Sequence, residues 1–237
     1  ELDVFDGSPP CQGFSTAGKR EIGDQRNQLF REFVRLLSGL RPRAFVMENV
    51  SGMVKGDFKV IFAEILRTLK ACGYRVKVRL LNAMFYGVPQ SRERMIFVGV
   101  RDDLGVEPSH PSGWSEPVVV REAFAGVGPS DSPVMTAVCR RYWDDAPQGG
   151  RVGKLNSIRK LHADRVAGTL TKGGGFREPL HHTEPRSAST PERKRIGSFP
   201  DPFLFTGHGD AMERIGNSVP PLLMRSIARH VRTLIAR

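Results

Sequence analysis

The 237-residue sequence predicts an α/β fold in which helices cover a mostly parallel sheet. Three observations support this class. Apolar strand-like segments alternate with amphipathic helical segments through the first hundred residues. Residues 102–185 then lose this periodicity and are rich in glycine, proline and serine. A last amphipathic segment over residues 221–236 closes the chain, so we expect an α/β structure interrupted by a small irregular domain.

The expected elements follow one another as strand, helix, strand, helix, strand and strand. Apolar spacing and breaker residues place them at residues 2–5, 27–39, 44–47, 58–71, 74–80 and 95–98. Gly73 follows the second helix as its C-terminal stop. Because the last two strands have no helix between them, we expect an antiparallel pair at one edge of the sheet.

Composition narrows the function classes. Apolar runs are too short for a membrane span, and the first residues do not resemble a secretion signal. Three cysteines without metal-ligand spacing predict a reducing, cytoplasmic setting and no metal site. The net charge of +11 and the pI of about 10.1 favour a polyanionic partner, although a solvated basic surface explains the charge about as well.

Two loops carry reactive side chains where ligands bind in open α/β sheets, beyond the carboxyl ends of the strands. Cys11 follows the stiff turn Gly7-Ser8-Pro9-Pro10, and Glu48 ends an apolar strand. Burial of Glu48 would raise its pKa and keep it protonated. A thiol beside such an acid is a nucleophile-and-acid arrangement, although each residue alone is more typical of a structural role.

Taken together, four motifs resemble the DNA cytosine-C5 methyltransferase family. They are Pro-Pro-Cys-Gln-Gly-Phe-Ser (9–15), Glu-Asn-Val (48–50), Tyr-Gly-Val-Pro-Gln-Ser-Arg-Glu-Arg (86–94) and Ile-Gly-Asn-Ser-Val-Pro-Pro (215–221), in the family's order. Ser198-Phe-Pro-Asp201, with Arg186 and Glu192 upstream, resembles a further block, and Thr169-Leu170 resembles a pair in the family's target-recognition region. The resemblance covers residues 3 to about 236.

The resemblance implies a Rossmann-like methyltransferase sheet that uses S-adenosylmethionine. Cys11 would add to carbon 6 of a cytosine flipped out of double-stranded DNA, and Glu48 would hold N3. Carbon 5 would then accept the methyl group. Arg92 and Arg94 would lie near the flipped base and its phosphate, with Arg94 the better candidate for O2. A salt-bridged strand edge with Glu93 is the alternative role for these arginines.

The resemblance also implies three segments: a partial catalytic domain (1–101), a target-recognition domain (102–185), and a return segment with the C-terminal helix (186–237). Basic and polar side chains in the first two segments, together with the apolar Leu170, are the expected DNA contacts. They are Gln12, Ser15, Lys19, Arg20, Gln90, Arg140, Arg141, Lys160, Thr169, Leu170 and Lys172. For the stretch 140–177, a flexible polar surface is the alternative.

The family's N-terminal Phe-x-Gly-x-Gly turn, which cradles the cofactor, is not found in the sequence. We therefore expect the missing segment to lie in a second chain or to have been lost, and the isolated chain to bind S-adenosylmethionine poorly. The matching cofactor positions are Pro10, Leu29, Asn217 and Ser218. A bacterial, nucleoid-associated modification methylase is the leading hypothesis. A catalytically silent DNA-binding subunit or remnant is the main alternative, and a tRNA cytosine-C5 methyltransferase, whose Cys-Phe-Thr signature is absent, ranks lower.

Overall fold

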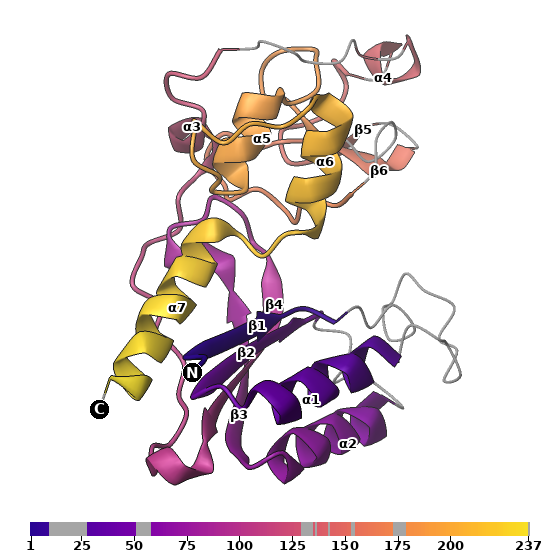
Figure 1. The fold of residues 1–237 in the computed structure, drawn as a ribbon. Coiled ribbons are helices and arrows are strands. Elements are labelled where there is room, and N and C mark those ends of the chain that lie inside the picture. Colours follow the sequence, from indigo (N-terminus) through magenta and orange to yellow (C-terminus); the bar gives the residue numbers. More distant parts are fainter. Residues whose placement is uncertain are drawn as a thin grey trace. The chain divides into compact units, whose positions relative to one another are not determined.

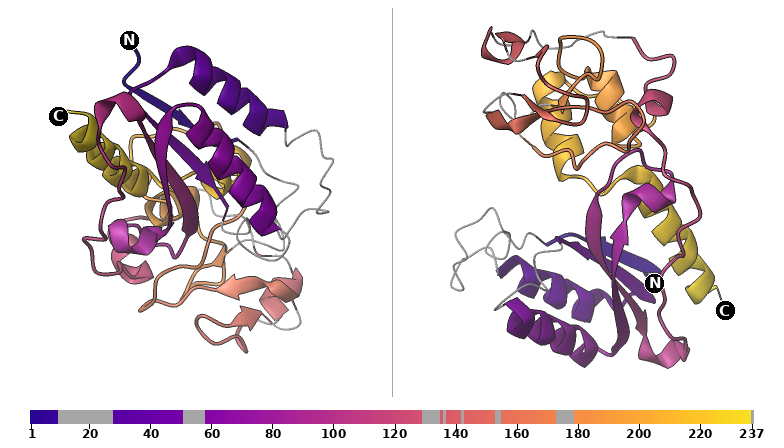
Figure 2. Two further views of the ribbon diagram at one scale, coloured as in Figure 1. Left: turned by 90° about the horizontal axis from the view of Figure 1, so that it is seen from below. Right: turned by 180° about the vertical axis from the view of Figure 1, so that it is seen from behind.

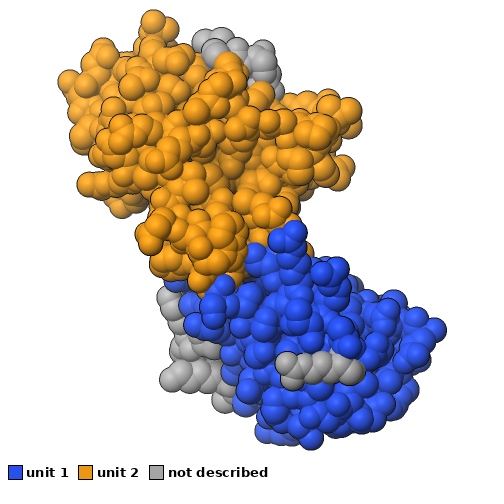
Figure 3. Space-filling view, turned by 90° about the vertical axis from the view of Figure 1, so that its left-hand side faces the viewer, with its two compact units in different colours: residues 1–81, 93–112, 226–237 blue, residues 82–92, 113–225 orange. Residues whose placement is uncertain are grey.

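The computed structural model describes residues 1–9, 28–50, 58–128, 135, 137–141, 143–152, 155–172 and 179–236 (Figure 1). These residues form two compact units, coloured separately in Figure 3. Unit 1 comprises residues 1–81, 93–112 and 226–237, and unit 2 comprises residues 82–92 and 113–225. Because the chain crosses between the units several times, each of them is assembled from segments that are distant in the sequence.

Unit 1 is built around a four-stranded sheet in the order β1-β2-β4-β3. Its strands are β1 (Val4–Gly7), β2 (Ala44–Asn49), β3 (Tyr74–Asn82) and β4 (Glu93–Arg101). β1 and β2 run parallel, whereas β2 and β4 run antiparallel. β4 thus lies between β2 and the edge strand β3, so the last two of the six early elements are neighbours at one edge of the sheet, as expected. Their antiparallel direction stays a prediction, whereas β4 runs antiparallel to β2.

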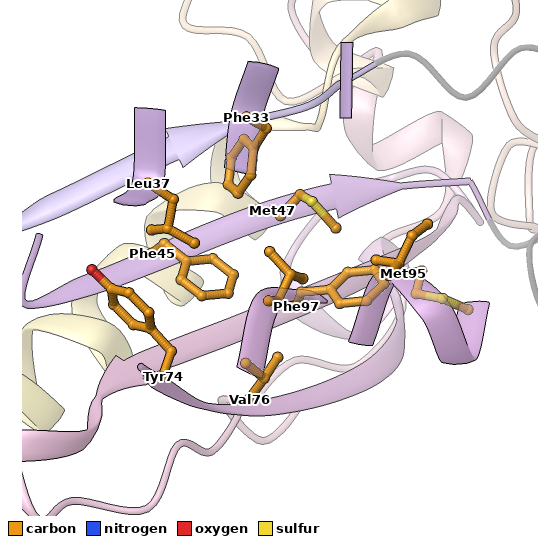
Figure 4. Close-up of a cluster of buried hydrophobic side chains, with 10 residues drawn as sticks. Phe33, Leu37, Phe45, Met47, Tyr74, Val76, Met95 and Phe97 are labelled. Carbon is orange, nitrogen blue, oxygen red and sulfur yellow. The ribbon is translucent and has the colours of Figure 1, made fainter. Parts of the chain in front are cut away.

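Helices α1 (Gln28–Leu40) and α2 (Phe58–Ala71) lie together on one face of this sheet, as Figure 2 shows. Alternate residues of β2 explain the packing, since successive side chains of a strand point to opposite faces. Phe45 and Met47 join the core beneath the two helices (Figure 4). Val46 instead lines a cavity of about 470 Å³ together with Val231 and Ile235 of the C-terminal helix α7 (Pro221–Ile235).

The core of unit 1 is rich in aromatic rings. Phe45 makes edge contacts with Phe33 of α1 at 5.9 Å and with Tyr74 of β3 at 5.3 Å between ring centroids. Gly99 of β4 lies opposite Phe45, and a Cβ atom there would come within 2.0 Å of the Phe45 ring. Glycine at 99 therefore makes room for the ring in the middle of the sheet.

Unit 2 has short elements, as expected for the irregular middle of the chain. Its helices are the 3₁₀ turn η4 (Ala83–Tyr86), α3 (Val120–Ala123), α4 (Ala137–Arg141), α5 (Thr190–Ile196) and α6 (His208–Asn217). A small sheet joins β5 (Arg151–Val152), β6 (Leu155–Lys160) and β7 (Pro179–Leu180). A further 3₁₀ turn, η5 (Asp102–Leu104), belongs to unit 1. The buried side chains of α5 and α6, Ile196, Ala211 and Ile215, share a core with Val120 and Leu170.

The predicted α/β class is confirmed, and all six early elements form at or near the expected residues. The expectation of a mostly parallel sheet was wrong: the sheet is mixed, because β2 pairs parallel with β1 but antiparallel with β4. The sequence did not predict α5 and α6. The compact units also divide the chain differently from the three expected segments, because residues 186–225 pack within unit 2. That three-part functional division stays a prediction. Among the described helices, none is both long and apolar enough to cross a membrane.

Candidate active site

The candidate active site begins at the edge where β1 and β2 end together. The two strands are parallel and in register, with Gly7 beside Met47. Glu48 and the residues after Gly7 therefore leave the sheet at the same edge, as expected for ligand-binding loops of α/β sheets. The sequence predicted this placement for the loop that carries Cys11 and for the acid Glu48.

Asn49 connects these two loops. It is 4% exposed, and its amide Nδ2 lies 3.5 Å from the carbonyl oxygen of the buried residue Pro9. Its Oδ1 accepts a hydrogen bond of 2.8 Å from the backbone N–H of Val50. The side chain of Asn49 thus fixes the start of the Cys11 loop beside the end of β2. In the sequence Asn49 stands out only as part of the Glu-Asn-Val motif, and its place just after an apolar strand was the signal for a structural role.

Glu48 and Arg94 form an ion pair across β2 and β4. Arg94 Nε lies 2.7 Å from Glu48 Oε1, and the two side chains are only 13% and 12% exposed. Burial lowers the pKa of Arg94, and the charge of Glu48 opposes that shift. A guanidinium at this distance also favours the ionised carboxylate, which opposes the effect of burial expected for Glu48. Arg94 further donates from Nη1 to the carbonyl oxygen of Glu93 at 2.8 Å.

Cys11, the predicted nucleophile, lies outside the residues that the structure describes. The same holds for the predicted cofactor contact Pro10 and for four predicted DNA contacts, Gln12, Ser15, Lys19 and Arg20. The distance between Cys11 and Glu48 therefore stays a prediction.

Arg92 and Gln90 are buried inside unit 2, each only 1% exposed. Arg92 donates from Nη1 to the carbonyl oxygen of Leu170 and from Nη2 to that of Gly216, both at 2.7 Å. Gln90 Oε1 accepts the backbone N–H of Leu170 at 2.9 Å, and its Nε2 donates to the carbonyl of Ile196 at 3.4 Å. These contacts hold backbone groups of unit 2, and direct contact of either side chain with DNA stays a prediction.

The other predicted DNA contacts differ in their accessibility. Thr169, Lys172, Arg140 and Arg141 are exposed, and Arg140 and Arg141 form the last turn of α4. Lys160 is engaged within unit 2, where its ammonium lies 4.0 Å from the centre of the Trp143 ring and 3.1 Å from the carbonyl oxygen of Ala146. Its predicted role in phosphate binding competes with these internal contacts and stays a prediction.

Three described residues could contact a cofactor. Leu29, at the start of α1 in unit 1, is 45% exposed. Asn217 is exposed at the end of α6 in unit 2, and the neighbouring Ser218 donates a hydrogen bond of 3.0 Å to the carbonyl oxygen of Ile215. An accessible apolar side chain and an accessible amide each suit one part of a nucleoside, and the meeting of Leu29 and Asn217 at one cofactor stays a prediction. Within the described residues, no cluster of histidine, cysteine and acidic side chains could hold a metal ion.

Arg186 and Glu192 form a second ion pair that supports α5. Arg186 donates from Nη1 and Nη2 to the two oxygens of Glu192, at 2.8 and 2.7 Å. Glu192 also accepts the backbone N–H of Ser189 at 2.8 Å, completing a capping box at the start of α5. Two residues that the sequence grouped only by motif are thus the anchor of this helix.

A family model for C-5 cytosine-specific DNA methylases matches residues 1–119 and 135–233. The chain belongs to this family. The matched ranges contain the Cys11 and Glu48 motifs, both motif arginines and the segment 215–221. They omit only a short stretch in the middle of the chain and the last residues.

Curated relatives include type II methyltransferases. The type II methyltransferase M1.HphI of Haemophilus parahaemolyticus is 34% identical over 98% of this chain and 68% of its own length. M.NgoFVII of Neisseria gonorrhoeae is 30% identical over 98% of this chain and 70% of its own length. A prophage-encoded E. coli protein described as a DNA modification methyltransferase shares the fold with a TM-score of 0.84, at 23% identity over 99% of this chain and 80% of that chain.

Proposed function

We propose that this chain methylates carbon 5 of cytosine in double-stranded DNA. The observation that carries the proposal is the buried Glu48–Arg94 pair, which sits at the edge where the chain leading to Cys11 leaves the sheet. Membership of the C-5 cytosine-specific DNA methylase family supports it. The exposed cations of unit 2, Arg140, Arg141 and Lys172, supply charge for phosphate contacts.

In this proposal, the thiolate of Cys11 forms a bond to carbon 6 of a cytosine that has been swung out of the helix. The electrons of the ring's 5,6 double bond then become available at carbon 5. Glu48 holds the N3 side of the ring and, after taking up a proton against the opposing charge of Arg94, supplies that proton to offset the charge developing at N3. Arg94 orients Glu48 through its Nε and faces the O2 side of the ring with its remaining donors.

S-adenosylmethionine supplies an electrophilic methyl group when it is bound, with Pro10, Leu29, Asn217 and Ser218 as the proposed contacts. After carbon 5 is methylated, a base removes the carbon-5 proton. The electrons of that bond restore the 5,6 double bond and expel the Cys11 thiolate, and N3 returns its proton to Glu48. The thiol is therefore regenerated in each cycle.

The decisive experiment traps the Cys11 bond. In DNA that contains 5-fluorocytosine, fluorine replaces the proton that the base must remove, so the covalent adduct should persist when S-adenosylmethionine is present. The adduct should disappear in Cys11→Ala. Cys72→Ala is the matched control, because Cys72 is a half-buried thiol of unit 1 whose Sγ donates to the carbonyl of Thr68 at 3.3 Å.

An adduct that survives Cys11→Ala contradicts the assignment of the nucleophile. Bisulfite sequencing of plasmid DNA from cells expressing the protein then tests the activity itself. If DNA binding persists but every cytosine remains convertible, the chain is a silent DNA-binding subunit.

A further inference from the structure

Two buried polar side chains of unit 2 lie where the sequence predicted substrate contacts. Gln90 and Arg92 are two residues apart, and both side chains form a hydrogen bond to the backbone of Leu170. Each is 1% exposed. A cation enclosed to this extent is stabilised by acceptors inside the protein, and here Nη1 and Nη2 of Arg92 donate to backbone carbonyls.

The acceptors of Arg92 come from two distant parts of the chain. Leu170 and Gly216 lie 78 and 124 residues beyond it, and each accepts one hydrogen bond of 2.7 Å from the guanidinium. The planar fork of an arginine can make both bonds at once, because its two terminal nitrogens have fixed relative positions. A lysine has a single nitrogen on a flexible stem, so it cannot reproduce this geometry.

The same short segment is held from several sides. Gln90 Oε1 accepts the N–H of Leu170 at 2.9 Å, so both backbone polar groups of Leu170 bond to the pair. The hydroxyl of Thr169 donates to the carbonyl oxygen of Ser91 at 2.8 Å, and Ser91 N–H donates to the carbonyl of Ala167 at 2.8 Å. The backbone around Leu170 therefore has its conformation set by residues 90–92.

Gly216 adds a steric limit on the other side of the segment. A Cβ atom at this position would lie 2.2 Å from the backbone nitrogen of Lys172 and 2.5 Å from the carbonyl carbon of Thr171. Segment 169–172 therefore packs directly against the backbone of α6. Leu170 is buried as its anchor, whereas Thr169 and Lys172 remain exposed.

We propose that Gln90 and Arg92 are positioning residues, which fix segment 169–172 so that Thr169 and Lys172 meet DNA in one geometry, and that neither contacts the substrate. This inference rests on the proposed DNA methylation. It assigns Arg92 a different task from Arg94, although both belong to the same motif. Sequence discrimination, rather than the chemical step, is then the property that depends on Arg92.

The test compares Arg92→Lys, Arg92→Met and Gln90→Leu with Lys194→Met in the protein as it is encoded. Lys194 is a matched control in unit 2, because its buried ammonium also donates to two carbonyls, those of Asp201 and Phe203, at 2.5 and 2.6 Å. One readout is amide hydrogen exchange of peptides that cover residues 165–172, relative to peptides of β2. The other is the ratio of methylation rates at the preferred sequence and at single-base variants of it, read by bisulfite sequencing.

We expect exchange of the Leu170 amide to be roughly tenfold faster in Arg92→Met and Gln90→Leu, the loss expected when one or two hydrogen bonds are removed. Sequence discrimination should fall by a similar factor. In both readouts, Arg92→Lys should lie between the wild type and Arg92→Met. Lys194→Met should change neither readout, even if it lowers the midpoint temperature of unfolding as much as Arg92→Met does.

Unchanged exchange and unchanged discrimination in Arg92→Met, together with slower methylation of bound DNA, would overturn the proposal in favour of direct substrate contact. Should Arg92→Met not fold, Gln90→Leu and Arg92→Lys decide the question by the same two readouts. A wild-type protein that methylates no DNA refutes the proposed function instead. The exchange measurement then still tests whether Gln90 and Arg92 fix segment 169–172.

Discussion

Arg94 Nε and Glu48 Oε1 lie 2.7 Å apart, and the pair joins the start of β4 to the end of β2. Antiparallel pairing of these strands brings the two ends together, with Glu48 opposite Ile96 and Asn49 opposite Met95. The ion pair is thus a direct consequence of the position of β4 beside β2. It places a cation at the carboxylate that is proposed to hold the cytosine ring.

Replacing either member of the pair should impair methylation. Glu48→Gln keeps the size of the side chain but cannot donate a proton to N3, so we expect a rate loss of about 10²-fold to 10³-fold. Arg94→Met leaves the carboxylate without its cation and should also lower the free energy of unfolding by about 2 kcal/mol. Single-turnover methylation of a DNA duplex and urea unfolding measure the two effects.

Arg75 and Glu107 provide the control for this prediction. Their ion pair in unit 1 has the same 2.7 Å distance, but the side chains are 41% and 63% exposed. Exposed pairs contribute little to stability, so Arg75→Met should change the unfolding free energy by less than about 1 kcal/mol and leave methylation unchanged. Wild-type methylation rates in Glu48→Gln would remove Glu48 from the mechanism.

The α/β layers of unit 1 were predictable because local patterns specify them. Apolar spacing identified both helices, and a continuous apolar run identified β2. The position of β4 was not predictable, because strand neighbours are chosen by packing between distant segments. Helix α5 could have been predicted from the sequence but was not. Ser189 and Glu192 are three residues apart at its start, the spacing of a capping box, and the structure forms both reciprocal contacts.

The candidate site was predictable to the extent that motifs carry it. Glu48 and Arg94 were singled out by their motifs, yet their pairing depends on strand order and could not be inferred. The burial of Arg92 was also hidden, because its acceptors lie 78 and 124 residues further along the chain. The sequence cannot distinguish an arginine that binds substrate from one that donates to backbone carbonyls, since the same donors serve both roles.

Tyr74 should make stability fall at high pH. Its hydroxyl donates to the carbonyl of Pro42 at 2.7 Å, and burial raises its pKa from 10.0 to about 12. The folded state favours the neutral phenol, so this contribution is complete below pH 10 and is lost between pH 10 and 12. Tyr74→Phe should be about 1 kcal/mol less stable at pH 8, because it lacks the hydrogen bond.

The difference between wild type and Tyr74→Phe should close near pH 11, since one unit above the unfolded pKa removes about 1.4 kcal/mol. Urea unfolding at pH 8, 10 and 11 measures it. A gap that stays constant over this range would show that the phenol does not titrate differently in the two states.

His181 should make stability fall in acid. Its Nδ1 accepts backbone hydrogen bonds from Thr183 and Glu184 at 3.3 and 3.1 Å, which requires an unprotonated nitrogen. Burial, followed by the charge of Arg186, lowers its pKa from 6.5 to about 4, against the opposing charge of Glu192. The neutral ring is favoured in the folded state, so its contribution is complete above pH 6.5 and is lost as the pH falls towards 4.

We expect His181→Asn to keep an acceptor at this position without titrating. Relative to wild type, the variant should lose less stability between pH 7 and pH 4.5, by on the order of 2 kcal/mol. Urea unfolding at several pH values in this range is the measurement. Glu192, Glu184 and His182 also face the ring. Parallel pH profiles for the two proteins would mean that these neighbours, and not His181, set the acid dependence.

Two glycines of α6 should respond in opposite ways to alanine. At Gly216 the added Cβ would meet the backbone of residues 171 and 172, and backbone atoms cannot rotate away. Gly216→Ala should therefore lower the free energy of unfolding by roughly 1 to 3 kcal/mol, as overpacking does. It should also displace segment 169–172 and reduce sequence discrimination.

At Gly209 nothing lies within 4 Å of the added atom. Because alanine favours helix, Gly209→Ala should be neutral or stabilising by up to about 1 kcal/mol. Urea unfolding midpoints and methylation of variant sites test both substitutions together. Equal effects at the two positions would show that Gly216 matters for helix propensity alone, and that close packing of segment 169–172 against α6 does not govern recognition.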